Sequence, residues 1–215
     1  MTKTAKLIIL GASAIAEVAY EYFTHDSPFD VVSFVVDREY MTSDHLLGLP
    51  VTPLDEVDER YPASGHRFFV ATNYAARNAL RKRMYGEMKA KGYAAASYVS
   101  SRAFVWPNCQ IGEHCFLLED NTLQPFSRIG VNVVLWSGNH IGHHSTIGDH
   151  TFVSSHVVVS GCCRIGASGF LGVNATIANN VTVGDDCIVG AGALVLGDVP
   201  AGETVVGLWR RRTRD

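Results

Sequence analysis

The segment from residue 129 to 152 reads IGVNVV-LWSGNH-IGHHST-IGDHTF, four consecutive hexads that each begin with an aliphatic residue. The same spacing holds without insertion over fifteen positions, all of them aliphatic: Ile111, Leu117, Leu123, Ile129, Leu135, Ile141, Ile147, Val153, Val159, Ile165, Leu171, Ile177, Val183, Val189 and Val195. A run of this length is very improbable at the chain's apolar frequency of 47%. The repeat is therefore the feature from which the fold can be predicted.

The columns beside the aliphatic residues are equally regular. Glycine follows the aliphatic residue at positions 112, 130, 142, 148, 166, 172, 184 and 190. The position two before it is mostly small and holds four of the five cysteines, namely Cys109, Cys115, Cys163 and Cys187. We therefore expect these cysteines to be small buried packing residues.

A period of six residues fits one short strand and one turn, and three such units close a triangular coil of eighteen residues. Residues i and i+18 then stack about 4.8 Å apart, one strand spacing. The aliphatic residues point inward and form ladders along the axis. The pattern predicts a parallel β-helix in a domain of residues 98–215. A structural protein could use the same prism, so the repeat alone does not establish catalysis.

The first half, residues 1–97, has a different pattern. Residues 6–10, 31–36 and 68–71 are expected strands, with helices after the first and the third, and this alternation predicts a small Rossmann-like parallel sheet. Ser13, Asp37 and Asn73 follow the three strands, where such sheets bind nucleotides. Because only Gly11 of the dinucleotide fingerprint is present, we expect a nucleotide or nucleotide-sugar pocket; a purely structural sheet is the alternative.

Composition excludes several classes. The net charge of −3 gives no reason to expect a nucleic-acid partner. Cysteine is odd in number and forms no CxxC pair, so neither a disulfide framework nor a zinc knuckle is indicated. The N-terminal apolar run is too short for a signal peptide or a membrane span, and with reduced thiols this favours a cytoplasmic protein.

A small Rossmann-like sheet followed by hexads resembles the bacterial sugar acetyltransferases of the PglD, perosamine N-acetyltransferase and NeuD type. The resemblance covers nearly the whole chain and rests on Leu-Gly-Ala-Ser (10–13), Asp37, Ala-Thr-Asn (71–73), the hexads and Gly-Asp-Val-Pro-Ala-Gly (197–202). It implies a left-handed β-helix, a homotrimer with active sites between subunits, acetyl-CoA as acyl donor and a nucleotide-linked amino sugar as acceptor. Ser13, Asp37 and Asn73 would contact the nucleotide or the sugar.

In that family a histidine followed by an acid lies one spacer residue after an aliphatic position. The matching segment is Ile141-Gly142-His143-His144, which places His143 at the catalytic position and His144 where the acid would stand. The loop after Ser13 also departs from the family's Gly-His-Gly, since it reads Ala14-Ile15-Ala16.

Stacking by eighteen residues puts His143 between Pro125 and Gly161. A glycine there leaves room for a thioester chain and bares a backbone N–H. We expect His143 to be the general base, with His140 and His144 as substrate contacts or alternative bases. The Gly161 region and Ala191, which we expect on the next coils along the same groove, would contact acetyl-CoA.

Five of the nine histidines lie between residues 140 and 156. His144, His150 and His156 are six apart and so fall at equivalent corners of three different faces. They cannot gather around one metal ion within one chain, and we expect His150 and His156 to be exposed turn residues and the protein to need no metal. A zinc site shared between subunits, as in the γ-class carbonic anhydrases, is the alternative.

The sequence thus predicts an acetyl-CoA-dependent N-acetyltransferase that acts on a nucleotide-linked amino sugar by direct attack of the amine. Two alternatives stay open. One is O-acetylation of a sugar hydroxyl, which depends more strongly on the base. The other is a trimeric binding module without chemistry.

Overall fold

The computed structural model describes residues 2–72 and 74–210 and divides into two compact units. One contains residues 1–73 and 80–98, and the other contains residues 74–79 and 99–215. Within the described residues, no helix is both long and apolar enough to cross a membrane.

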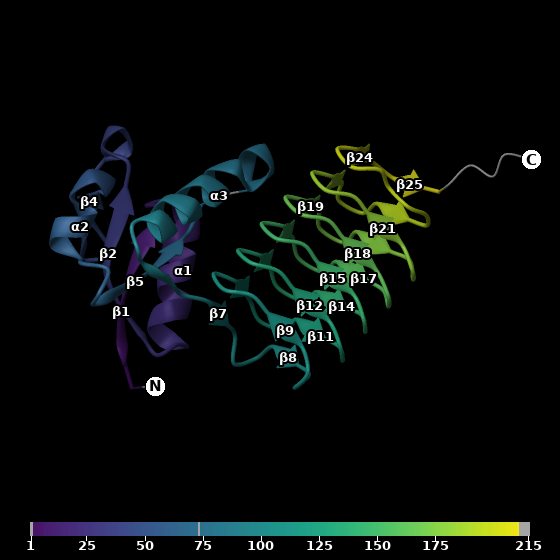
Figure 1. Ribbon diagram of the computed structural model, residues 1–215, viewed down its shortest axis with the longest axis horizontal. Helices are drawn as coiled ribbons and strands as arrows, with labels where there is room; N and C mark the ends of the chain where they lie inside the picture. Colours follow the sequence, from purple (N-terminus) through teal and green to yellow (C-terminus); the bar gives the residue numbers. More distant parts are fainter. Residues whose placement is uncertain (1, 73, 211–215) are drawn as a thin grey trace, which may run out of the picture. The chain divides into compact units, whose positions relative to one another are not determined.

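The first unit is built on a six-stranded sheet with the order β3-β4-β2-β1-β5-β6 (Figure 1). All pairs are parallel except β3 with β4. The strands are β1 Ala5–Leu10, β2 Phe29–Val36, β3 His45–Leu46, β4 Leu49–Pro53, β5 His66–Val70 and β6 Ala94–Ala95. The helices are α1 Ala14–His25, α2 Val57–Arg60 and α3 Ala75–Ala90, with 3-10 turns at Arg38–Tyr40 and Leu54–Glu56. The predicted parallel sheet is confirmed.

The central strand explains the apolar run at the start of the chain. Leu7 to Leu10 are fully buried, because β1 lies between β2 and β5 and both of its faces are covered. Strands β3, β4 and β6 and the short helix α2 were not predicted. The two-residue strands β3 and β6 leave no readable alternation of apolar and polar residues.

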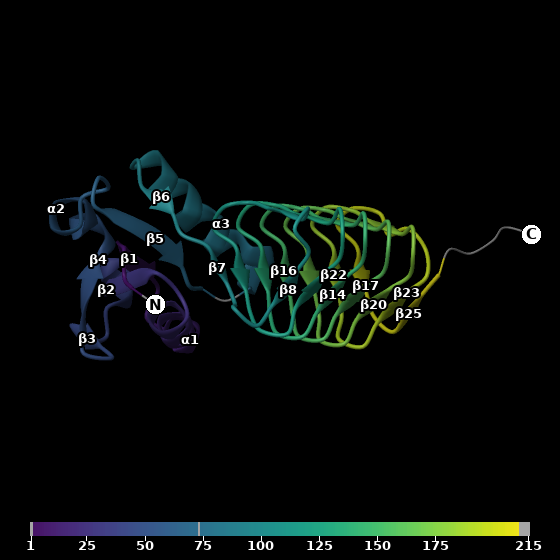
Figure 2. The same cartoon turned by 90° about the horizontal axis from the view of Figure 1, so that it is seen from below.

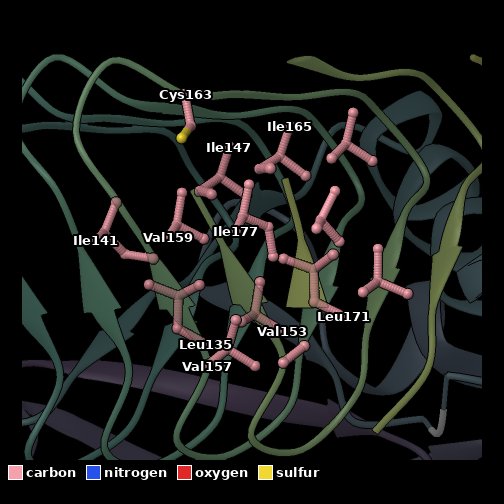
Figure 3. Packing of buried hydrophobic residues seen from close by; sticks show 14 of the residues in the cluster. Leu135, Ile141, Ile147, Val153, Val157, Val159, Cys163, Ile165, Leu171 and Ile177 are labelled. Carbon is pink, nitrogen blue, oxygen red and sulfur yellow. The ribbon is translucent and has the colours of Figure 1, made fainter. Parts of the chain in front are cut away.

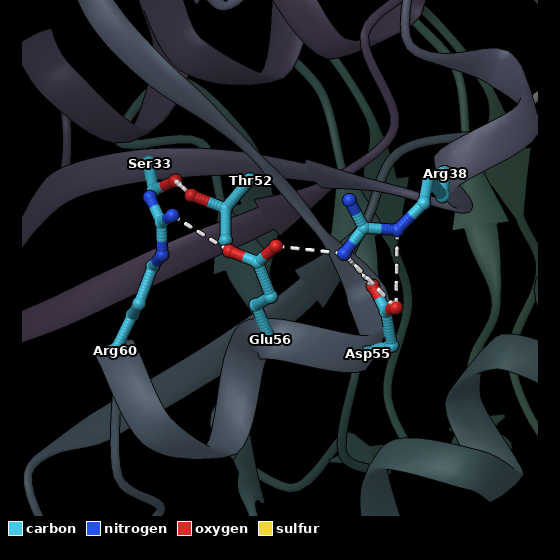
Figure 4. Close-up of polar contacts among 6 residues, drawn as sticks. All are labelled: Ser33, Arg38, Thr52, Asp55, Glu56 and Arg60. Atoms are coloured by element: carbon cyan, nitrogen blue, oxygen red, sulfur yellow. Dashed lines mark hydrogen bonds and ion pairs between the residues drawn. The ribbon is translucent and has the colours of Figure 1, made fainter.

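Polar contacts fasten the segments that follow β2 and β4 to each other (Figure 4). The guanidinium of Arg38 donates to both carboxylate oxygens of Asp55 and to Glu56, and Glu56 also pairs with Arg60. Hydrogen bonding to Arg38 lowers the pKa of Glu56. Because these groups are exposed, we expect them to orient the two turns rather than to add much stability.

The second unit is a prism of three parallel sheets (Figure 2). Sheet I contains β7 Tyr98–Val99, β10 Phe116–Leu117, β13 Val134–Leu135, β16 Phe152–Val153, β19 Phe170–Leu171, β22 Ile188–Val189 and β24 Thr204–Val205. Sheet II contains β8 Phe104–Val105, β11 Thr122–Leu123, β14 His140–Ile141, β17 Val158–Val159, β20 Thr176–Ile177, β23 Leu194–Val195 and β25 Leu208–Trp209. Sheet III contains β9 Gln110–Ile111, β12 Arg128–Ile129, β15 Thr146–Ile147, β18 Arg164–Ile165 and β21 Thr182–Val183.

The pairing register confirms stacking by eighteen residues. Ile141 pairs with Leu123 on one side and with Val159 on the other, and the other coils repeat this spacing. Only the final coil is shorter, since Val189 pairs with Val205 and Val195 with Trp209. All the predicted inward positions are buried except Ile111, which is half-buried (Figure 3).

The small-residue column lines the same interior. Cys115, Cys163 and Cys187 are fully buried there, as predicted, whereas Cys109 is only half-buried. Polar members of the column bond to the backbone: Ser145 Oγ donates to the carbonyl of Ser160, 2.7 Å away, and accepts from the N–H of Cys163. These bonds make a polar side chain tolerable beside the aliphatic ladders.

The glycine column has a steric cause. A Cβ atom on Gly148 would lie 2.5 Å from the carbonyl carbon of Gly166, and one on Gly142 would lie 2.5 Å from that of Ser160. At these two glycines the neighbouring coil therefore lies too close for a side chain.

Ile147 tests the ladder, because its side chain is fully buried between Ile129 and Ile165. We expect Ile147→Val to lower the free energy of unfolding by about 0.5–1.5 kcal/mol and Ile147→Ala by about 2–5 kcal/mol. Urea unfolding followed by circular dichroism at fixed protein concentration measures both. Val173→Ala is the control, since Val173 is exposed. Equal losses from Ile147→Ala and Val173→Ala would contradict the assigned interior.

Candidate active site

Each corner of the β-helix is formed by a residue with positive φ, three positions after the inward aliphatic residue. His144, His150 and His156 have φ values of 59°, 60° and 58° and lie at three different corners, as the spacing predicted. The prediction that both His150 and His156 are exposed is confirmed for His156 and wrong for His150. The His150 ring is half-buried, because its Nδ1 is 2.9 Å from Nδ2 of Asn132 in the coil below.

His143 lies at the corner between sheets II and III, and its backbone is held on both sides. Its N–H donates to Oε1 of Gln124 over 3.0 Å, and its carbonyl accepts from the N–H of Cys162 over 2.8 Å. The side chain itself is exposed. The backbone of this residue is therefore fixed while the imidazole stays accessible to solvent and substrate.

The imidazole of His143 packs against Gly161, as stacking predicted. A Cβ on Gly161 would lie 2.7 Å from Nε2 of His143. Any side chain at position 161 would consequently displace the ring.

His144 takes over the place beside Nδ1 of His143. The two Nδ1 atoms are 3.1 Å apart, and the His144 ring stacks on Phe126 with centroids 4.6 Å apart. One of the two nitrogens must donate and the other accept. When His143 donates, its proton sits on Nδ1 and the lone pair of Nε2 is free to act as a base.

One expectation about Gly161 is wrong. Its backbone N–H donates to Oδ1 of Asn179 over 2.9 Å, and the neighbouring amides of Ser160 and Cys162 bond to carbonyls of Ile177 and His143. Because all three donors are used within the chain, this segment has no free amide for a thioester oxygen. The contribution of Gly161 is the space that it leaves.

The other predicted residues of the β-helix lie apart. His140 points outward on sheet II, between Thr122 and Val158 of the adjacent strands, and is half-buried. Ala191 is exposed at the corner between sheets I and II, whereas His143 lies at the corner between sheets II and III. The two residues do not share a groove within one chain, which corrects that expectation.

Three residues of this corner were missed from the sequence: Gln124 and Cys162 beside His143, and Asn179 beside Gly161. Cys162 is the only exposed cysteine among the five, and its Sγ is 4.0 Å from Nδ1 of His143. The eighteen-residue period could have identified it, since Cys162 stacks on His144 in the next coil.

The first unit contains a separate pocket at the carboxyl ends of β1, β2 and β5, with a volume of about 350 Å³. Ser13 and Asp37 both line it, together with Gly11, Ala71 and Thr72. Gly11 has a φ of 119°, and a Cβ there would lie 2.5 Å from the carbonyl oxygen of Ala71, so only glycine fits this turn. The N-terminus of α1 begins directly after Ser13 and adds a partial positive charge to this side of the pocket.

The Asp37 carboxylate already has one partner, because Oδ2 accepts from Arg83 over 3.1 Å. The remaining oxygen can accept from a ligand. Asn73, the third predicted contact, lies outside the described residues.

No family model matches the sequence, and no curated protein is similar to it. Solved structures do match. The acetyltransferase domain of PglB from Neisseria gonorrhoeae has a TM-score of 0.84 at 24% identity and covers 94% of this chain and 96% of its own. A variant of perosamine N-acetyltransferase from Caulobacter crescentus, in complex with CoA and GDP-perosamine, has a TM-score of 0.83 at 23% identity and covers 95% of this chain and 94% of its own.

A third match is WeeI from Acinetobacter baumannii, with a TM-score of 0.72 at 24% identity over 95% of this chain and 97% of its own. The chain has the fold of these three proteins. The predicted combination of a small α/β domain with a left-handed β-helix is thereby confirmed.

The exposure of Cys162 gives a direct test of the geometry of this acetyltransferase fold. Burial raises the pKa of the Cys163 and Cys187 thiols, and the thiolate is the reactive form. We expect a thiol-specific disulfide reagent to modify Cys162 of the native protein first, with the buried cysteines reacting only after unfolding. Mass spectrometry of the labelled peptides locates the modified residue. A fast phase that persists in Cys162→Ser would refute the assignment.

Proposed function

We propose that this protein is an acetyl-CoA-dependent N-acetyltransferase whose acceptor is a nucleotide-linked amino sugar. The observation that carries the proposal is the exposed imidazole of His143, held against Gly161 with a second imidazole at its Nδ1. The solved neighbours support the reaction class, because one is an acetyltransferase domain in complex with acetyl coenzyme A and another holds CoA and GDP-perosamine.

In the proposed reaction the sugar amine attacks the carbonyl carbon of the thioester. The new C–N bond forms as the C–S bond breaks, the amine proton passes to Nε2 of His143, and CoA leaves as the thiol or thiolate. His143 can accept this proton only while its own proton is on Nδ1, so the partner at Nδ1 decides whether the ring is a base. His144 supplies the acceptor that a carboxylate supplies elsewhere.

The pocket of the first unit suits the nucleotide part of the acceptor. It combines the amino end of α1, which favours phosphate, with an Asp37 carboxylate able to accept from a ribose or base. We assign Ser13 and Asp37 as its contacts.

Sheet II supports a homotrimer. Its outward residues include the exposed apolar side chains of Phe104, Val158, Leu194 and Leu208, and exposed Trp106 and Leu196 follow two of its strands. The outward residues of sheet III are instead polar or charged: Gln110, Arg128, Thr146, Arg164 and Thr182. A contiguous exposed apolar face is typical of a protein–protein interface. If sheet II packs against other subunits, His140 lies at that interface and the His143 corner lies at its edge.

The base assignment is tested by His143→Ala. We expect turnover to fall by about 10²–10⁴ while the fold and assembly persist, because one positioned base contributes that much. The assay follows CoA release from acetyl-CoA with GDP-, UDP- and dTDP-linked amino sugars. His156→Ala is the matched control, an exposed histidine at another corner.

Full activity of His143→Ala would exclude His143 as the base. Turnover with the matched hydroxy sugars but not with the amino sugars would replace N-acetylation by O-acetylation. No CoA release with any acceptor would favour the binding module.

The trimer is tested by Leu194→Arg, which places a charge on the apolar face of sheet II. We expect this variant to be monomeric by sedimentation velocity, since an unpaired charge cannot be buried in the interface. Thr182→Arg, on the outward face of sheet III, is the control and should remain trimeric. A trimeric Leu194→Arg variant would mean that sheet II is not the interface.

A further inference from the structure

Among the described residues, one cluster of three potential metal ligands is found, formed by His143, His144 and Cys162. The proposed reaction gives Cys162 no role. One ligand atom from each lies within 4.8 Å of the others, and all three side chains are exposed. His144 and Cys162 occupy the same corner of successive coils, with φ values of 59° and 60°. The stacking of the β-helix therefore creates the cluster, although the cysteine is eighteen residues away from His144.

The spacing fits a tetrahedral ion. Zinc ligands at their usual bond lengths are separated by about 3.3 Å between two nitrogens and about 3.6 Å between nitrogen and sulfur. The two Nδ1 atoms are 3.1 Å apart, and Sγ of Cys162 is 4.0 Å from Nδ1 of His143. Only small side-chain rotations are needed to bring the three ligand atoms to the separations of a tetrahedral zinc site.

The backbone already holds these ligands in position. The Cys162 N–H donates to the His143 carbonyl, the His143 N–H donates to Gln124, and the His144 ring lies on Phe126. Two imidazoles and one thiolate are the ligand types that zinc and its neighbours in the transition series prefer. Three protein ligands leave the fourth position to water.

We propose that His143, His144 and Cys162 bind one Zn²⁺ ion per chain and that this ion switches off the base. The inhibitory part rests on the proposed function; the binding site does not. A ring that coordinates zinc through Nδ1 carries its single proton on Nε2, so His143 can no longer accept a proton there. The same ion removes His144 as the partner of His143. Metal binding and base catalysis are consequently exclusive states of one histidine.

Equilibrium dialysis of the chelator-treated full-length protein against Zn²⁺ tests the site independently of activity. We expect one zinc per chain, and loss of this zinc in Cys162→Ser and in His144→Ala. With Co²⁺ as a spectroscopic probe, the wild-type protein should show a thiolate-to-cobalt charge-transfer band that Cys162→Ser lacks. His156→Ala is the control and should bind zinc and cobalt like the wild type.

The inhibitory step has its own measurement. Zinc should abolish CoA release by the wild-type enzyme, a chelator should restore it, and Cys162→Ser should be insensitive to zinc relative to its own zinc-free rate. Absence of stoichiometric zinc in the wild-type protein, or its retention in either Cys162→Ser or His144→Ala, would overturn the site. Stoichiometric zinc with an unchanged rate would overturn the switch. If the chain transfers no acetyl group at all, the dialysis and the cobalt spectrum still decide the site.

Discussion

Strands of the β-helix donate their backbone hydrogen bonds to the coil eighteen residues away, and the inward aliphatic residues stack in the same register. The two requirements reinforce each other: Gly142 donates to the carbonyl of Val159 while Ile141 packs on Val159 itself. A shift of one residue would turn the aliphatic column out of the prism and move the glycines away from the close contacts that exclude a Cβ. The strands of the β-helix therefore tolerate no shift of register.

This register also determines the chemistry. A residue on a coil cannot move independently of the coils above and below it. His143 therefore faces Gly161, and Cys162 faces His144, because the members of each pair are eighteen residues apart. The room beside Nε2 of His143 arises from the missing side chain at position 161. A rigid scaffold of this kind holds a reactive group in place without a dedicated set of supporting side chains.

The parts of the molecule that could be predicted are those governed by a strict period. The β-helix, its buried cysteines and the His143–Gly161 contact all follow from counting by six and eighteen. Side-chain hydrogen bonding has no such period, which is why the occupation of the Gly161 amide by Asn179 was not foreseen. Ala191 was misplaced because its distance from His143 along the chain is not a multiple of eighteen, so the two residues occupy different corners of the triangle. In the first unit, Ser13 and Asp37 were found at the strand ends where parallel sheets bind ligands, whereas the ion pair between Asp37 and Arg83 joins residues with no common pattern.

In the proposed reaction the partner of His143 Nδ1 is an imidazole and not a carboxylate, and this changes how firmly the tautomer of His143 is set. A carboxylate can only accept, so it would keep the proton of His143 on Nδ1. Between two neutral imidazoles the shared proton can belong to either ring, and only one of the two arrangements leaves Nε2 of His143 free. If both are equally populated, the competent fraction is halved, which costs about 0.4 kcal/mol of activation free energy. That cost is small beside the contribution of a positioned base, and an amine needs less help than a hydroxyl because it is already nucleophilic when neutral. The arrangement is therefore compatible with the proposed N-acetylation, and the same two imidazole nitrogens belong to the proposed zinc ligand set.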